Sequence, residues 1–118
     1  MCNYLKSNFK DILIIAGNVA TKEGAKFLWD NGADLVKIGI GASGICTTRV
    51  NAGSGVPQIS ALKDVDDFRR LNPYYSGKLM ISDGGHKSSG DVAKALAFAD
   101  MVMLGSLYSG CKETPGVI

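Results

Sequence analysis

The strongest constraint on the fold is that short apolar runs alternate along the chain with segments of helical periodicity. The apolar runs lie at residues 12–16, 34–38, 79–81 and 101–104. Helices are predicted after residue 21, from residue 57 to about residue 71, after residue 88, and as a short turn after residue 107, besides one at residues 2–9. Strands that alternate with helices indicate parallel βαβ units. The sequence therefore predicts an α/β fold, either as half of a (β/α)8 barrel or as an open four-stranded parallel sheet.

Burial is also predicted from the local pattern. The continuous apolar run Ile12 to Ala16 is typical of a strand that is buried on both faces. Trp29 repeats at helical spacing with other apolar residues, which favours a position in the core. The charged residues between Asp64 and Arg70 are interpreted as a solvated helix face, and His86 as a solvent-facing loop residue.

Each apolar run ends in a glycine-rich or polar signature. These signatures are Gly17-Asn18, Gly39-Ile40-Gly41, Asp83-Gly84-Gly85 and Gly105-Ser106. Ligand sites of parallel α/β folds lie at the carboxyl ends of the strands. We therefore expect all four signatures to face one common site. The long connection from residue 39 to residue 56 has the length of a functional loop.

That connection carries Cys46, which is followed by two hydroxyl residues and Arg49. A nearby arginine favours the thiolate, which is the nucleophilic form of cysteine. The alternative is an inert, buried thiol. The three cysteines form no CxxC pair and the sequence has one histidine, so we do not expect a zinc site. We expect instead a cytoplasmic protein with free thiols. A net charge of +2 with scattered basic residues gives no support for nucleic acid as a partner, and no run is long enough for a membrane span.

Seven motifs together closely resemble the IMP dehydrogenase and GMP reductase family. They are IAGNVAT at 15–21, VKIGIG at 36–41, CTTR at 46–49, GVPQ at 55–58, SDGG at 82–85, SGDVAKA at 89–95 and VMLGS at 102–106. The family fold is a (β/α)8 barrel. The resemblance implies that residues 1–118 are a partial barrel catalytic domain, roughly strands five to eight. The first four strands and the C-terminal flap are then not part of this sequence.

The resemblance implies a nucleophilic role for Cys46, which attacks C2 of the purine of IMP. Hydride then passes to NAD, and water hydrolyses the resulting thioimidate to XMP. Thr48 matches the threonine that assists proton transfer. In the reductase branch, NADPH works in the reverse direction and ammonia is expelled from GMP.

The resemblance also implies the binding residues. Asp83 matches the carboxylate that holds the ribose hydroxyls. The phosphate and the rest of the substrate contact Gly84, Gly85, Gly105, Ser106, Ser43 and Gly44. The cofactor is assigned to Asn18, Gly39 and Gly41, and the carbonyls of Gly39, Gly41 and Cys46 are assigned to a potassium ion. One departure stands out, because the family loop has Gly-Ser where this chain has Ser43-Gly44.

The motifs favour the dehydrogenase branch over the reductase branch. A family tetramer or another homo-oligomer is implied. Two alternatives from other classes remain. In the first, the chain is a split or truncated nucleotide-binding half-barrel that pairs with a complementary half and has no activity alone. In the second, it is a phosphate-binding βα protein without purine selectivity.

Overall fold

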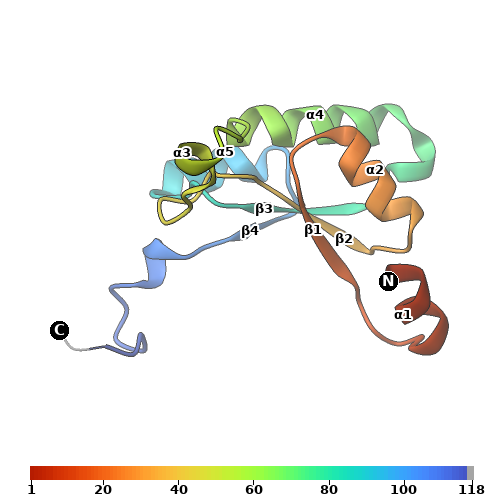
Figure 1. Cartoon of the computed structure of the whole chain (residues 1–118), viewed down its shortest axis with the longest axis horizontal. Coiled ribbons are helices and arrows are strands. Elements are labelled where there is room, and N and C mark those ends of the chain that lie inside the picture. The colour runs from red at the N-terminus through yellow and green to blue at the C-terminus, as the bar shows by residue number, and fades with distance from the viewer. Residues whose placement is uncertain (117–118) are drawn as a thin grey trace.

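A computed structural model, which describes residues 1–116, contains one parallel sheet with four strands (Figure 1). The strands are β1 (Ile15–Val19), β2 (Leu35–Ile38), β3 (Leu79–Asp83) and β4 (Met101–Met103). They lie side by side in the order in which they occur along the chain, and every neighbouring pair is parallel. The predicted α/β fold with parallel strands is therefore confirmed.

Three helices form a layer on one face of this sheet (Figure 1). They are α2 (Lys22–Asp30), α4 (Gln58–Leu71) and α5 (Ser89–Leu96). The shorter elements are α1 (Cys2–Asn8), α3 (Thr48–Asn51), and the 3-10 turns η1 (Pro73–Tyr75) and η2 (Ser106–Tyr108). Among residues 1–116, no helix combines the length and the hydrophobicity that crossing a bilayer requires. Val117 and Ile118, the end of the predicted tail, lie outside the described residues.

The core lies between the sheet and the helical layer. Val36, Ile38 and Met80 reach it from the strands, and Leu62 reaches it from α4. Trp29 is 2% exposed, as its helical spacing predicted. Thr21 begins α2 as predicted, because its hydroxyl accepts a hydrogen bond from the Gly24 N–H. These contacts hold the carboxyl ends of the strands in a fixed relative position.

The prediction for the first strand is wrong in both position and burial. The strand begins at Ile15 rather than Ile12, and its side chains are exposed or half-buried. The reason is that β1 lies at an edge of the sheet and that the helices cover only one face (Figure 1). Large apolar side chains therefore remain exposed on the strands, namely Ile15, Leu79, Met101 and Met103.

The sequence pattern predicted that the charged residues of α4 form a solvated face, and this prediction is wrong for two of them. Arg69 is 9% exposed and Asp66 is 2% exposed. The Arg69 guanidinium binds Asp66 at 2.9 Å and Asp100 at 2.7 Å, and it donates to the carbonyls of Lys78 and Phe98. These contacts join α4 to the starts of β3 and β4. A charged side chain is tolerated in a buried position when it is paired and hydrogen-bonded in this way.

Candidate functional site

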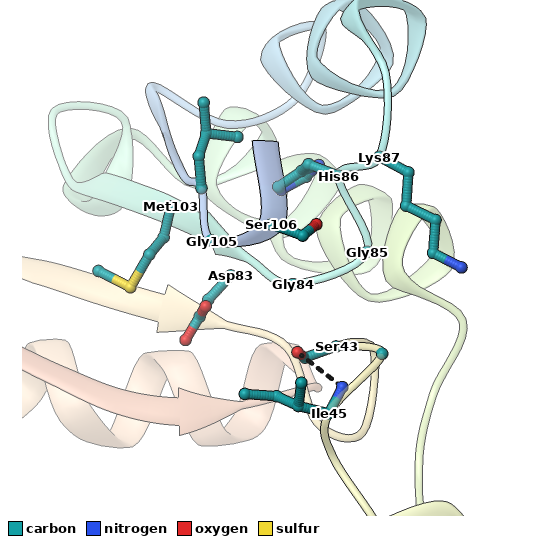
Figure 2. A pocket seen from close by; sticks show the side chains of 12 residues that line it. Ser43, Ile45, Asp83, Gly84, Gly85, His86, Lys87, Met103, Gly105 and Ser106 are labelled. Carbon is teal, nitrogen blue, oxygen red and sulfur yellow. Dashed lines mark hydrogen bonds between the residues drawn. The ribbon is translucent and has the colours of Figure 1, made fainter. Parts of the chain in front are cut away.

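The loop that follows β2 and the signatures at the ends of β3 and β4 surround one cavity of about 360 Å³ (Figure 2). All seven residues predicted to contact the substrate line it, namely Ser43, Gly44, Asp83, Gly84, Gly85, Gly105 and Ser106. Five lining residues were not predicted, namely Ile45, His86, Lys87, Met103 and Leu104. The first signature, Gly17-Asn18, lies within β1 and reaches this region through Asn18, whose amide contacts Asp83. The signatures of β3 and β4 therefore face one cavity as expected, whereas Gly39-Ile40-Gly41 lies outside its lining and only the loop beyond it forms part of the wall.

Glycines allow the loops around the cavity to pack closely. Gly84 and Gly85 have φ angles of +101° and +84°, a region that favours glycine. A Cβ atom on Gly84 would lie 3.0 Å from the Ser43 backbone nitrogen. A Cβ atom on Gly39 would lie only 2.1 Å from the Asp83 carbonyl oxygen. The cavity wall includes Gly84, Gly85 and Gly105, which carry no side chain, and turns with accessible backbone N–H groups are suited to a phosphate or another anion.

Ser43 keeps a polar contact despite its reversed order with Gly44. Its hydroxyl accepts a hydrogen bond of 3.4 Å from the Ile45 N–H, drawn dashed in Figure 2. Both Ser43 and Gly44 line the cavity. The reversal therefore leaves a hydroxyl at the cavity wall.

Asp83 is the acidic residue of the cavity wall, and two donors hold one of its oxygens. Oδ2 accepts hydrogen bonds from Lys37 Nζ and from Asn18 Nδ2, both at 2.8 Å. Burial on its own would raise the pKa of the Asp83 carboxyl, but the bonds from Lys37 and Asn18 outweigh it and lower that pKa. Asp83 is thus an ionised acceptor at the cavity wall. Lys37 was missed by the motif analysis, although a lone charge within the apolar strand β2 was a usable signal.

Cys46 lies on the loop beside the cavity, and it is Ile45 that contributes to the lining. The Cys46 Sγ lies 3.2 Å from Thr48 Oγ1. The pKa of the Cys46 thiol is lowered first by the hydroxyl and backbone of Thr48, then by the Gly41 backbone and last by the charge of Arg49. The structure therefore brings Cys46 and Thr48 into contact, and Thr48 favours the thiolate more than Arg49 does.

Arg49 instead fastens the two ends of this loop together. Its Nη2 donates a 2.6 Å hydrogen bond to the Val56 carbonyl. Cβ atoms placed on Gly41 and Gly55 would lie 2.6 Å and 2.7 Å from the Arg49 Cγ. The Arg49 stem therefore packs between these two glycines. Gly41, predicted to contact the cofactor, has this packing role as well.

Asn18 and Gly39, two of the predicted cofactor contacts, are hydrogen-bonded to one another. The Asn18 amide nitrogen donates to the Gly39 carbonyl at 2.9 Å as well as to Asp83. Two donated bonds use both protons of this amide, so Asn18 has only its carbonyl oxygen left for a ligand. The Gly39 carbonyl retains one lone pair. The potassium site predicted at the carbonyls of Gly39, Gly41 and Cys46 stays a prediction.

His86 is buried, and its prediction as a solvent-facing residue is wrong. It is 6% exposed, and its Nε2 lies 3.0 Å from the Ser82 hydroxyl. Gln58 Nε2 donates to the same hydroxyl at 2.9 Å. The two glycines after Asp83 turn the chain back, which brings His86 onto Ser82 four residues earlier. This small network holds His86, which is itself a lining residue of the cavity.

Comparisons with known proteins agree on one family. The family model described as "IMP dehydrogenase / GMP reductase domain" matches residues 1–118. An inosine-5'-monophosphate dehydrogenase of Staphylococcus saprophyticus is 54% identical over 114 residues, which cover 96% of this chain and 22% of that protein. Those of Staphylococcus aureus strains Mu50 and USA300 are each 52% identical over the same coverage. The chain thus spans about a fifth of the length of the relatives it matches.

Proposed function

Because the chain belongs to the IMP dehydrogenase and GMP reductase family, we propose that it forms part of a purine nucleotide oxidoreductase that converts IMP to XMP. The observation that carries this proposal is the cavity, whose wall includes every residue predicted to bind the substrate. The relatives named above are dehydrogenases, which supports that branch over the reductase branch. Residues 1–118 would then be a portion of the catalytic barrel that contains its last four strands.

In this proposal the cavity holds a purine nucleoside monophosphate. The backbone amides at Gly84, Gly85 and Gly105 contact the 5′-phosphate, since bare amides in a turn bind anions. The Ser43 and Ser106 hydroxyls are further phosphate contacts. Asp83 accepts hydrogen bonds from the ribose. This arrangement directs the base toward the loop that carries Cys46.

Cys46 is the proposed nucleophile. Its thiolate, favoured by Thr48, attacks C2 of the hypoxanthine, and the C2 hydrogen leaves as hydride. NAD, when bound, supplies the hydride acceptor. Water then adds to the C2–sulfur thioimidate, and the C–S bond breaks to give XMP and the free thiol. Thr48, 3.2 Å from the sulfur, is placed to move a proton during these steps.

The proposed cofactor contacts fit the polar groups that remain available. The free carbonyl oxygen of Asn18 can accept a hydrogen bond from a carboxamide such as that of nicotinamide. We keep Gly39 and Gly41 as backbone contacts. The proposed potassium ion would use carbonyl oxygens of this loop, which are the hard ligands that a group I cation prefers.

The uncovered sheet face supports a further part of this proposal. Exposed apolar side chains such as Ile15 and Met103 lie on the strands, and both β1 and β4 are edge strands. Exposed strand edges favour pairing with further strands. We therefore propose that complementary barrel strands, and in the assembled enzyme a homo-oligomer, complete the fold. The free thiols of the described chain suit a cytoplasmic location.

The proposal is tested by assaying the full-length protein that contains this sequence. With IMP and NAD, we expect formation of NADH, and Cys46→Ser should abolish it. Oxidation of NADPH with GMP and without NADH formation would instead assign the reductase branch. Binding of IMP, GMP and ribose 5-phosphate with equal affinity, and no turnover, would favour a phosphate-binding protein without purine selectivity.

A further inference from the structure

Lys37 is a charged side chain on a strand that is otherwise apolar. It lies in β2 between Val36 and Ile38, which are both fully buried. Side chains alternate along a strand, so Lys37 projects from the face opposite to these two. That is the face without helices in Figure 1. A lysine on an apolar sheet face is unfavourable unless its charge is paired.

The sheet makes room for this side chain and directs it to a single partner. Lys37 pairs in register with Gly17 on one side and Ile81 on the other. A Cβ atom on Gly17 would lie 2.8 Å from the Lys37 Cβ, so glycine leaves the space that the lysine stem occupies. Lys37 Nζ then lies 2.8 Å from Asp83 Oδ2, and each side chain is 25% exposed. The contact is therefore partly desolvated.

The two oxygens of Asp83 have different surroundings. Oδ2 accepts bonds from both Lys37 and Asn18, whereas no donor among residues 1–116 contacts Oδ1. Asn18 is held in turn by the Gly39 carbonyl at 2.9 Å. The carboxylate is thus fixed at one oxygen by donors from two neighbouring strands. The other oxygen remains an open acceptor on a residue that lines the cavity.

We propose that Lys37 is a positioning residue that holds Asp83 Oδ2, so that Oδ1 is the acceptor for a ribose hydroxyl of the bound nucleotide. This inference rests on the proposed function, because it requires a nucleoside monophosphate in the cavity. Lys37 itself acts through Asp83. The consequence of this positioning is selectivity for ribonucleotides over 2′-deoxyribonucleotides. A preoriented carboxylate binds the 2′-hydroxyl more strongly, and the deoxy analogue lacks that hydroxyl.

The test compares the affinities of IMP and 2′-deoxy-IMP, measured by calorimetry on the full-length protein. A hydrogen bond to a charged group contributes about 1.5–3 kcal/mol, so the wild type should prefer IMP by about tenfold or more. In Lys37→Met, which keeps the stem and removes the amine, this preference should fall to within about threefold. Lys37→Arg should restore it. Loss of the Lys37 charge in itself would weaken the binding of both anionic ligands to a similar extent, so the ratio of affinities isolates the positioning effect.

Asn18→Ala is the second variant, because it removes the other donor to Oδ2 and leaves Lys37 in place. It should also reduce the preference for IMP, and it keeps the inference testable should Lys37→Met unfold. A wild-type preference that both variants retain would overturn the inference and leave the proposed function standing. Failure of the wild type to bind IMP would instead overturn the proposed function.

Discussion

Arg69→Met should destabilise the chain strongly, whereas Arg70→Met should not. Both arginines bind Asp66, at 2.9 Å and 2.6 Å, but their side chains are 11% and 65% exposed. Removing Arg69 leaves the Asp66 carboxylate buried without its best-shielded partner. It also removes a donor from two carbonyls and from Asp100, which keeps the Met80 N–H. Loss of one partner of a buried ion pair costs about 3–5 kcal/mol. An exposed pair contributes about 0–1 kcal/mol.

Urea unfolding, followed by the fluorescence of Trp29, measures this difference. Trp29 is the one tryptophan of the sequence and is 2% exposed, so unfolding changes its surroundings. With a slope of about 1–3 kcal/mol per molar urea, the Arg69→Met midpoint should fall by about 1 M or more. The Arg70→Met midpoint should move by a small fraction of that. Equal shifts in the two variants would refute the buried role of Arg69.

Two further predictions concern the loop that carries Cys46. Gly55→Ala would force its methyl group against the Arg49 stem, 2.7 Å away, so the pH midpoint of Cys46 alkylation by iodoacetamide should shift. The matched control is Gly77→Ala, whose methyl group meets no atom within 4 Å and which should leave the midpoint unchanged. Thr48→Val removes the contact that lowers the pKa of the Cys46 thiol most. The pKa of the thiol should therefore rise, and alkylation at neutral pH should slow. An unchanged pH midpoint would show that Thr48 does not favour the thiolate.

Much of the fold followed from the alternation of apolar runs and helical segments. The cap at Thr21 and the core position of Trp29 were readable, because each depends on neighbours within one turn of a helix. The first strand was misjudged because its composition suits burial on both faces. Whether a second layer covers it is decided by the topology, which a local pattern does not contain.

The site shows the same division between local and long-range information. The glycine-rich strand ends predicted the cavity wall, since parallel strands bring their carboxyl ends together. The burial of His86 was missed, because it depends on a contact with Ser82 of β3, whose hydroxyl also binds Gln58 of α4. The pairing of Lys37 with Asp83 was missed for a similar reason. It joins residues of neighbouring strands that lie far apart in the sequence.

Covalent labelling of Cys46 tests the central claim most directly. The full-length protein is incubated with 6-chloropurine ribotide, a purine nucleotide whose C6 loses chloride to a thiolate, so that the label reports a thiolate held against the base of the bound nucleotide. Mass spectrometry of the digested protein should then find the nucleotide on the peptide that contains Cys46, and excess IMP should prevent the reaction. Label on Cys2 or Cys111 in place of Cys46, or label on Cys46 that IMP does not suppress, would contradict the account.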